Sequence, residues 1–217
     1  MQSKLKIAAS AENNSVSKQD AENLRVEHFA TAQLPSQYGQ FQIVAFTNNR
    51  DGKDHVAILH GDVRGQTGVL TRIHSECLTG DVFGSLKCDC GDQLDLALQE
   101  IAATDAGIIL YMRQEGRGIG LANKVKAYSL QDSGLDTVEA NLHLGFDDDL
   151  RDYEISARML ELLGVESIVL MTNNPSKVEG LQESGVIVEE RRPIQTTPNP
   201  HNFNYLETKR QKSGHIL

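Results

Sequence analysis

The chain has 217 residues, 39% of them hydrophobic, which suits one large domain or two small ones built on a substantial core. Its formal net charge of −9 argues against a nucleic-acid-binding surface, because the phosphate backbone selects for a broad positive field. No apolar run reaches the about 18 residues that a membrane span needs, and no signal-peptide pattern follows Met1. We therefore expect a cytoplasmic protein that binds neither nucleic acid nor a membrane.

The N-terminal part of the chain predicts an arm followed by strands. Residues 1–33 are mostly polar, and we expect them to form a mobile arm, with ordered structure beginning near Leu34. Apolar and alternating runs at residues 41–46, 55–63 and 68–74 then predict three successive strands. The opening of the ordered region is therefore rich in β-structure.

Helices and strands alternate in the second half. Apolar residues recur at i, i+3, i+4 and i+7 from Leu94 to Ile101, which predicts an amphipathic helix. Asn174 and Pro175 suit the N-cap and first turn of a later helix. The complete pattern predicts an α+β fold, with a β-rich N-terminal part followed by mixed α/β segments around one core in residues 34–217. The remaining expected elements are a strand at 107–112, helices at 121–132 and 153–163, strands at 167–172 and 186–190, and an irregular or helical tail from 199.

All three cysteines of the chain, Cys77, Cys88 and Cys90, lie within one short segment. Three thiolates can bind zinc at about 2.3 Å each and leave a fourth position for water, whereas a structural zinc site normally has four protein ligands. Three buried, reduced cysteines are an alternative, but polar neighbours such as Asp89 oppose it, and the odd count opposes a closed set of disulfides. We therefore expect one zinc ion with an open coordination position.

A glycine-rich segment, residues 113–126, carries glycine at Gly116, Gly118 and Gly120 among several basic residues. It lies between an expected strand and an expected helix, where main-chain N–H groups favour bound anions. The spacing is neither that of a P-loop nor that of a dinucleotide-binding fingerprint. A phosphate-binding loop and a simple glycine-rich turn with solvated basic residues both remain open.

The segment FDDDLRDYE, residues 146–154, combines acidic residues with one arginine. It suits a solvated acidic loop in which Asp152 stabilises the start of the next helix. An extended backbone would also place Asp149 and Arg151 on one face, where they could share a site with the metal and the glycine-rich segment.

Several longer runs together resemble one family. RIHSECLTGDVFGSLKCDCGDQL, RQEGRGIGL, DTVEANLHLGF, DLRDY and TNNPSK occur in order, and over roughly residues 34–217 the chain resembles GTP cyclohydrolase II, the enzyme that opens riboflavin biosynthesis. Lys87 departs from the family, which more often has arginine there; the positive charge is kept but bidentate geometry is lost. Because many relatives carry a dihydroxybutanone phosphate synthase domain first, and the arm is too short for one, the expectation is the monofunctional form.

The resemblance implies zinc-dependent hydrolysis of GTP to 2,5-diamino-6-(5-phosphoribosylamino)pyrimidin-4(3H)-one, formate and pyrophosphate. Zinc on Cys77, Cys88 and Cys90 would activate the water that attacks carbon 8 of guanine, and Mg²⁺ would accompany the triphosphate. For pyrophosphate release the family mechanism makes Arg151 a nucleophile with Asp149 as its proton acceptor. An arginine that only stabilises phosphate charge, beside a general-base aspartate, would leave the same pattern. Family members are homodimers, so a homodimer is expected.

The resemblance also implies a substrate site. Glu115 would accept hydrogen bonds from the N–H edge of guanine, Arg117 and Lys177 suit the triphosphate, and Tyr128 belongs to the ring-hydrolysis steps, where it would orient a water. The positions that resemble GTP contacts are Arg72, Ile73, His74, Ser75, Glu76, Gln93, Glu115, Gly116, Arg117, Thr137, Thr172 and Lys177.

Two other functions compete with this one. A zinc nucleobase deaminase needs H-x-E followed by P-C-x-x-C; His74 and Glu76 give the first motif, but the second is absent from the sequence. A zinc-stabilised nucleotide-binding or regulatory module would need a fourth protein ligand, for which His74 and Asp89 are the candidates.

Overall fold

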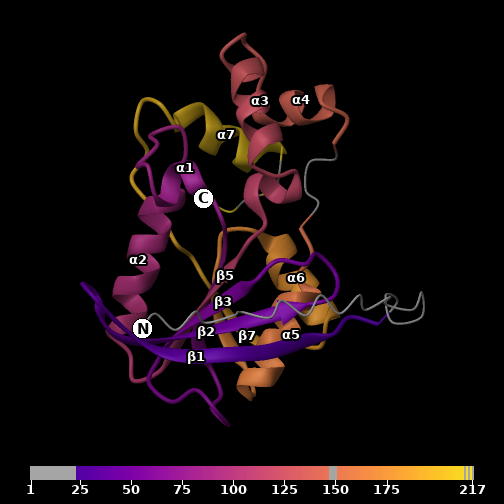
Figure 1. Ribbon diagram of the computed structural model, residues 1–217. Coiled ribbons are helices and arrows are strands. Elements are labelled where there is room, and N and C mark those ends of the chain that lie inside the picture. Colours follow the sequence, from indigo (N-terminus) through magenta and orange to yellow (C-terminus); the bar gives the residue numbers. More distant parts are fainter. Residues whose placement is uncertain (1–22, 147–150, 213, 215, 217) are drawn as a thin grey trace, which may run out of the picture.

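The computed structural model describes residues 23–146, 151–212, 214 and 216. Within these residues the strands form one mixed sheet of seven strands in the order β1-β2-β3-β5-β4-β6-β7, accompanied by helices (Figure 1). A β-rich opening followed by mixed α/β segments on one sheet confirms the expected α+β fold class.

The sheet has two halves that differ in strand direction. In the antiparallel half, β1 (Val26–Ser36) pairs with β2 (Gly39–Asn48), and β2 with β3 (His55–His60). β3 then pairs in antiparallel fashion with β5, which opens the parallel half. The parallel half consists of β5 (Gly107–Met112), β4 (Val69–Ser75), β6 (Ile168–Met171) and β7 (Val188–Arg192).

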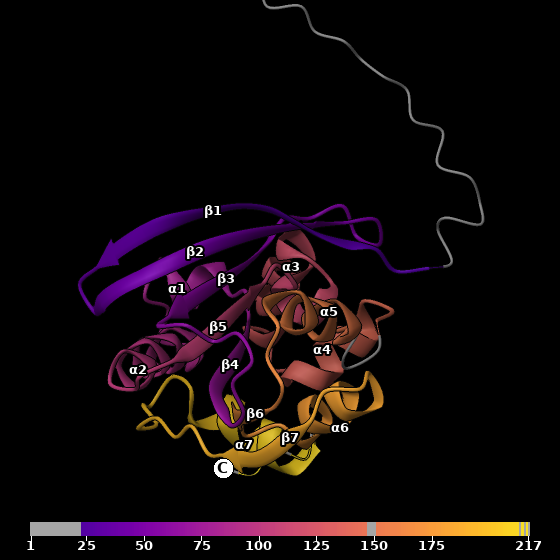
Figure 2. The same ribbon diagram turned by 90° about the horizontal axis from the view of Figure 1, so that it is seen from below.

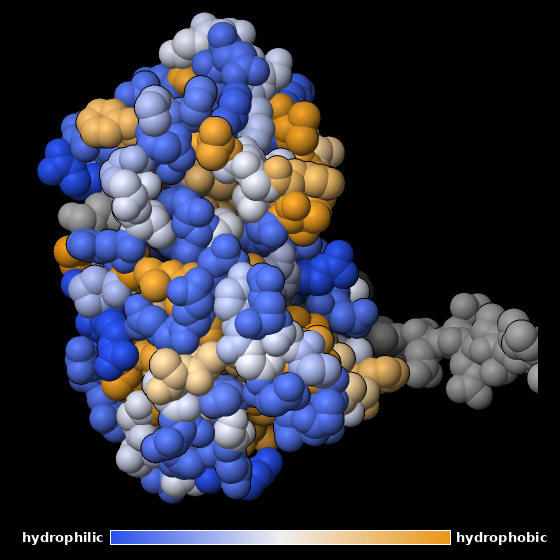
Figure 3. Space-filling view, turned by 90° about the vertical axis from the view of Figure 1, so that its left-hand side faces the viewer, coloured by the Kyte–Doolittle hydropathy of each residue, from blue (hydrophilic) through white to orange (hydrophobic). Residues whose placement is uncertain are grey.

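Helices cover both faces of the sheet. Helix α2 (Cys90–Ala102) packs on one face, and α5 (Glu154–Leu163) and α6 (Pro175–Glu183) pack on the other (Figure 2). Side chains alternate between the two cores along each strand: Ile109 joins the core under α2, whereas Ile108 joins the core under α5 and α6. Burial on both faces explains the continuous apolar run of β5. Seen from the side of α2, the surface is mainly hydrophilic (Figure 3).

The remaining helices form a helical cap beyond the carboxyl ends of β4 and β5 (Figure 1). The cap consists of α1 (Leu78–Asp81), α3 (Leu121–Gln131), α4 (Thr137–His143) and α7 (Phe203–Lys212). A short 3₁₀ helix, η1 (Glu115–Gly118), joins β5 to α3. In open sheets of this kind, ligands bind outside the carboxyl ends of parallel strands.

Several local predictions are confirmed. The side chain of Asn174 accepts from the backbone N of Ser176 at 3.1 Å, and Pro175 is the first residue of α6. Helix α5 ends at Gly164, which has a left-handed φ of 75°. Asp152 stabilises the start of α5, as its carboxylate accepts from the backbone N of Glu154 at 2.7 Å. No helix in the described ranges combines the length and the apolar character needed to cross a bilayer.

The main difference from the sequence analysis is the start of the sheet. Strand β1 begins at Val26, so the expected start of ordered structure near Leu34 is too late. Most side chains of β1 are exposed, and its main chain is paired with β2. Main-chain pairing does not require apolar side chains, which is why a polar edge strand resembles an arm in the sequence. The short helices α1 and α4 were also not expected, and the strand expected over 55–63 ends at His60.

Candidate active site

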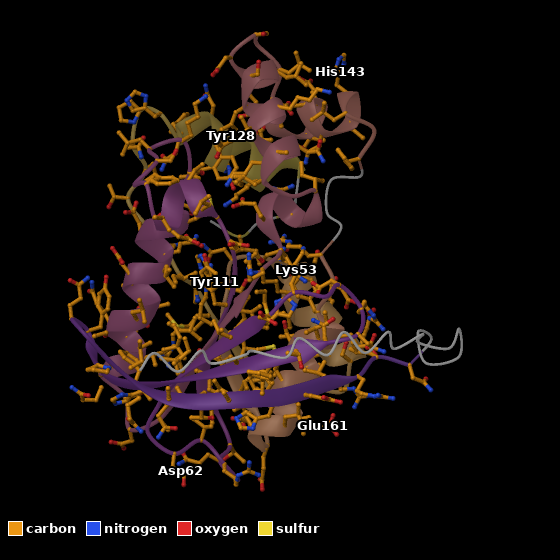
Figure 4. All side chains as sticks on the ribbon, viewed as in Figure 1. Lys53, Asp62, Tyr111, Tyr128, His143 and Glu161 are labelled. Atoms are coloured by element: carbon orange, nitrogen blue, oxygen red, sulfur yellow. The ribbon has the colours of Figure 1, made fainter. Side chains whose placement is uncertain are left out.

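A pocket lies between the carboxyl ends of the parallel strands and the helical cap. In Figure 4, Tyr128 marks the cap, and Asp62 and Glu161 mark the opposite end of the sheet. Of the described residues that line the pocket, none belongs to β1, β2 or β3. Fifteen residues expected in the site are among them: Arg72, His74, Ser75, Glu76, Cys77, Cys88, Cys90, Gln93, Glu115, Gly116, Arg117, Tyr128, Arg151, Thr172 and Lys177.

Three expected site residues are placed differently. Ile73 is fully buried in the core under α5 and α6, and only its carbonyl oxygen, which accepts from Nζ of Lys177 at 2.7 Å, relates it to the site. Thr137 is the first residue of α4, the helix that contributes Asn141 to the pocket. Asp149 lies outside the described residues.

The three cysteines converge from separate positions. Cys77 precedes α1, Cys88 lies in the following loop, and Cys90 is the first residue of α2. Their sulfur atoms lie within 4.8 Å of one another, and those of Cys77 and Cys88 are 3.6 Å apart. A tetrahedral zinc ion about 2.3 Å from each sulfur requires sulfur atoms about 3.8 Å apart. The thiol cluster therefore fits the metal that the sequence implies.

Glycine is required beside the thiol cluster. A Cβ atom added to Gly80 would lie 2.9 Å from Sγ of Cys88 and 3.2 Å from Sγ of Cys77. Real carbon and sulfur atoms do not pack this closely, so any side chain here would displace a thiol. The local sequence between the first two cysteines thus contributes to the spacing of the sulfur atoms.

The three thiols differ in the direction in which their pKa values are shifted. Hydrogen bonds from Cys88 and Cys90 lower the pKa of the Cys77 thiol, and the Lys124 ammonium 3.0 Å from its sulfur acts in the same direction. The hydrogen bond that Cys88 donates to Cys77 raises the pKa of Cys88 to about 11, and the pKa of Cys90 is also raised. The neighbouring thiols and the Lys124 ammonium thus favour the thiolate form at Cys77 over that at Cys88 or Cys90.

Lys124 connects the thiol cluster to Glu115. Its Nζ lies 2.7 Å from Oε1 of Glu115. Burial would lower the pKa of Lys124, but the hydrogen bonds to Cys77 and Glu115 outweigh it and the pKa is raised. Glu115 also accepts from the backbone N of Gly116 on Oε1, at 3.0 Å, and from that of Leu78 on Oε2, at 2.7 Å. These three donors fix the carboxylate against the loop that carries the first cysteine.

Neither candidate for a fourth metal ligand takes that role. Nε2 of His74 lies 3.0 Å from Oδ1 of Asp81, and burial lowers the pKa of His74. Asp89 accepts from Nε2 of Gln93 at 2.6 Å and from Nζ of Lys209 at 3.1 Å. Among the described histidines, cysteines and acidic residues, only the three cysteines bring ligand atoms together at this place. A structural zinc module closed by His74 or Asp89 is therefore not supported.

The glycine-rich segment forms another wall of the pocket. Gly116 and Gly120 have φ angles of 64° and 83°, and Arg117 has a φ of 59°, a left-handed conformation that is rare outside glycine. Such backbone strain is concentrated at functional sites. Arg151 approaches from the start of α5, with Nη1 3.4 Å from Oγ of Ser75. Basic side chains of several elements thus converge on one space, which favours an anionic ligand.

Tyr128 of α3 lines the pocket together with the thiol cluster. Its hydroxyl lies 3.4 Å from Oγ1 of Thr79, and burial raises its pKa. The ammonium groups of Lys87 and Lys124 lie 5.1 Å and 5.7 Å from its ring centroid. Lys87 also pairs with Asp132 at 2.6 Å, so a lysine is sufficient for the contacts seen at this position.

Part of the pocket wall was not expected from the sequence. Asn141 on α4, Asn173 after β6, and Tyr205 and Lys209 on α7 all line the pocket. The tail was expected to be irregular or helical, but no local pattern connects Lys209 with Asp89, which is 120 positions away.

Comparisons with known proteins identify the family. The family model described as GTP cyclohydrolase II matches residues 27–193. The chain is 53% identical over 194 residues to GTP cyclohydrolase-2 of Proteus mirabilis, covering 89% of this chain and 98% of that protein. It is 55% identical over 193 residues to the riboflavin biosynthesis protein RibBA of Bacillus subtilis, covering 88% of this chain and 48% of that protein.

One solved structure shows a weak similarity. RibBX of A. baumannii, a two-domain 3,4-dihydroxy-2-butanone 4-phosphate synthase, gives a TM-score of 0.43 at 18% identity, covering 79% of this chain and 40% of that chain. The assignment depends on the family model and on the similar sequences, both of which cover most of the chain. The chain belongs to the GTP cyclohydrolase II family.

Proposed function

We propose that the chain hydrolyses GTP to 2,5-diamino-6-(5-phosphoribosylamino)pyrimidin-4(3H)-one, formate and pyrophosphate, using zinc held by Cys77, Cys88 and Cys90. The observation that carries this proposal is the thiol cluster in the same pocket as the converging basic side chains, in a chain of this family. The zinc ion would supply a Lewis acid that makes water nucleophilic near neutral pH, as needed for attack on carbon 8 of guanine.

Glu115 is the proposed reader of the guanine edge. A carboxylate has about four acceptor positions, and Gly116, Lys124 and Leu78 already donate to three of them. The contacts leave one position, on Oε2, for a guanine N–H. This arrangement supports one hydrogen bond to the base, whereas the resemblance implied more than one. The three internal donors hold the carboxylate in place, which favours selectivity.

The basic residues of the pocket are proposed to bind the triphosphate. Arg117 and Lys177 come from two different elements, η1 and α6, and both line the pocket. Mg²⁺ is proposed to accompany the triphosphate through phosphate oxygens, since magnesium in nucleotide sites is held largely by phosphate and water.

Arg151 is proposed to act at the α-phosphate, where pyrophosphate leaves, with Asp149 as its proton acceptor. The two chemical roles of Arg151 differ in what they require. A nucleophile must lose a proton from a guanidinium whose pKa exceeds about 12, whereas a charge-stabilising arginine needs only its position. Mass spectrometry after quenching without acid separates them, because only the nucleophile forms a phosphoramidate-linked nucleotide.

Tyr128 is proposed to orient a water for the second hydrolysis of the ring. Its hydroxyl lies close to Thr79, which is two residues after Cys77, so the hydroxyl faces the thiol cluster. Tyr128→Phe would keep the ring between Lys87 and Lys124 and remove only the hydroxyl. The proposal predicts release of a formylated, ring-opened product from this variant, measured by mass spectrometry.

The proposed assembly is a cytoplasmic homodimer, by analogy with the family; light scattering of the purified chain tests it. The function itself is tested by incubating the protein with GTP, Mg²⁺ and Zn²⁺ and assaying formate, pyrophosphate and the diaminopyrimidine separately. We expect all three products, with formate lost after zinc chelation and restored by added Zn²⁺. Absence of all three products would overturn the proposal.

A further inference from the structure

Helix α7 contributes to the pocket although it lies beyond residues 27–193, the part that the family model matches. Tyr205 and Lys209 line the pocket, and Nζ of Lys209 lies 4.3 Å from the ring centroid of Tyr205. Both side chains come from a segment that contributes no strand to the sheet. Their contacts show what α7 adds to the site.

A buried chain of hydrogen bonds runs from α7 to the sheet. Nζ of Lys209 lies 3.1 Å from Oδ1 of Asp89, and the other carboxylate oxygen accepts from Nε2 of Gln93 at 2.6 Å. Oε1 of Gln93 accepts from Nη2 of Arg72 at 2.6 Å, and Nη1 of Arg72 donates to the carbonyl of Met171 at 2.9 Å. The four residues whose side chains form these hydrogen bonds, from Lys209 to Arg72, are each less than 9% exposed.

Asp89 determines which groups donate and which accept in this series of hydrogen bonds. A carboxylate only accepts, so the amide of Gln93 must present its NH₂ group to Asp89 and its oxygen to Arg72. An amide rotated by half a turn would bring two donors against the guanidinium. Asp89 in turn is buried at the start of α2 and needs a positive partner, because an uncompensated buried carboxylate is strongly unfavourable. Lys209 supplies that partner from the opposite side of the pocket wall.

One donor of Arg72 remains after these contacts. Its Nε is buried and has no hydrogen-bond partner among the described residues. Arg72 lines the pocket, so this donor is available to an acceptor that enters it. Buried guanidinium donors are normally satisfied, which indicates that the missing partner belongs to the ligand.

We propose that Lys209 and Asp89 are positioning residues, which orient the amide of Gln93 and thereby hold Arg72 with its Nε–H directed to an anionic oxygen of the bound nucleotide. The inference depends on the proposed function, because it takes a nucleotide as the ligand of the pocket. Helix α7 thus completes the phosphate-binding part of the site.

The test measures binding of guanosine 5′-(α,β-methylene)triphosphate, an analogue that cannot release pyrophosphate, by calorimetry on the full chain, together with kcat and KM for GTP. Lys209→Met should weaken analogue binding about tenfold or more, because the loss of the buried pair frees Gln93 to rotate. Lys209→Arg keeps the charge next to Asp89 and should restore most of the affinity. Arg210→Met is the matched control: it removes a positive charge from the same helix, but Arg210 is exposed and pairs with Glu207.

A thermodynamic cycle separates positioning from general stability. If Lys209 acts through Arg72, Lys209→Met should weaken binding much less in an Arg72→Met background than in the unmodified chain. The double variant Asp89→Asn with Lys209→Met removes both charges, avoids a lone buried charge, and should still bind the analogue weakly. Thermal unfolding of each variant ensures that binding is compared well below the melting temperature.

The outcomes are distinct. Unchanged analogue affinity in folded Lys209→Met and in the double variant would overturn the inference, as would fully additive losses in the cycle with Arg72→Met. If the unmodified chain bound no analogue and released no pyrophosphate, the proposed function would fail first. If the unmodified chain is active and Lys209→Met binds the analogue with the same affinity, the inference is rejected and the proposed function is not.

Discussion

The antiparallel and parallel halves of the sheet share both hydrophobic cores but differ in what they do. Val44 and Leu59 of the antiparallel half pack in the same core as Ile73 and Leu170 of the parallel half. Yet the lining residues of the pocket come from the parallel half, from helices α2 and α6, from the helical cap and from the connecting loops. Parallel strands end at the same edge, so the segments that follow them meet there, whereas antiparallel strands send successive loops to opposite edges.

A histidine in the antiparallel half shows that a reactive side chain alone does not make a site. His55 on β3 is fully buried; its Nε2 lies 3.2 Å from Asp51, and its Nδ1 accepts from the backbone N of Arg113 at 3.1 Å. Burial lowers its pKa. His55 therefore connects β3 to the segment after β5, a structural role, whereas His74 of β4 lines the pocket.

The largest effect on turnover is expected at the thiol cluster. Cys88→Ser removes one of three metal ligands, so most bound zinc and all formate release should be lost, while pyrophosphate release can persist because it depends on other residues. Elemental analysis and product assays measure both. Leu86→Ala, exposed in the same loop, is the control and should keep its zinc. Full zinc occupancy in Cys88→Ser would show that the ligand assignment is wrong.

The second effect concerns Arg151. Arg151→Ala should lower pyrophosphate release by about 10²- to 10³-fold, since either proposed role needs its guanidinium at the α-phosphate. Arg158→Ala, exposed on helix α5, which follows Arg151, removes an equal charge and should leave the rate unchanged. Arg151→Lys that retains substantial pyrophosphate release without a trapped adduct would favour charge stabilisation. If Arg151→Ala instead releases pyrophosphate at the rate of the unmodified chain, residues 146–154 are only a solvated acidic loop.

Glu115→Gln should reduce kcat/KM for GTP by about 10²-fold, because an amide brings a donor to a place where three donors already meet. The unmodified chain should use ATP poorly. Comparing GTP with ITP, which lacks the 2-amino group, identifies the base atom that Glu115 contacts. If Glu115→Gln lowers activity equally with GTP and with ITP, Glu115 contacts a part of guanine other than the 2-amino group. Equal use of ATP and GTP by the unmodified chain would contradict the role of Glu115.

A smaller effect is expected at Gly80, because it supports the thiols without binding metal. Gly80→Ala should weaken zinc binding by about tenfold, as changes around metal ligands commonly do. Gly180→Ala is a matched control, since its added Cβ would lie 2.7 Å from Cδ2 of Tyr153, far from the thiols in the sequence and in the fold. It should lower the melting temperature but not zinc affinity. Equal zinc affinity in both variants would mean that the loop adjusts to the extra methyl group.

The sequence predicted the parts of the site that are local. The thiol cluster and the capped start of α6 each lie in a short run whose residue types predict what that run does, and the glycine-rich segment was recognised as either a phosphate-binding loop or a simple turn. Their meeting in one pocket came from the family resemblance, since nothing in the spacing relates residue 77 to residue 177. The fold class also followed from local patterns, because apolar periodicity is strong in buried strands.

The missed features depend on contacts between distant segments. Strand β1 is exposed on most positions, so its sequence lacks the apolar alternation of a half-buried strand, and only its pairing with β2 reveals it. The pairing of Lys209 with Asp89 joins helix α7 to the segment that carries Cys88 and Cys90. From the sequence alone, each of these two charged residues would be expected to face solvent. Likewise, the contacts of Glu115 with Lys124 and Leu78 occupy acceptor positions of its carboxylate that the sequence leaves open.

The smallest effect on turnover is expected in the antiparallel half. Leu59→Ala removes a buried side chain from β3 and should destabilise the fold by about 2–5 kcal/mol. The loss should be near the lower end, because Leu59 also lines a second cavity, where the truncated site has room to relax. Since β3 contributes no residue to the pocket, kcat and KM measured well below the melting temperature should change less than about twofold.

Leu170→Ala makes the same truncation in the parallel half and sharpens the comparison. Leu170 is fully buried on β6, two positions before Thr172, whose hydroxyl accepts from the backbone N of Asn174 at the pocket edge. A cavity there should lower stability as in Leu59→Ala and also raise KM, because the end of β6 carries the start of α6 and Lys177. Equal loss of kcat/KM in both variants, at equal stability, would show that the antiparallel half shapes the site and that the division between the two halves is wrong.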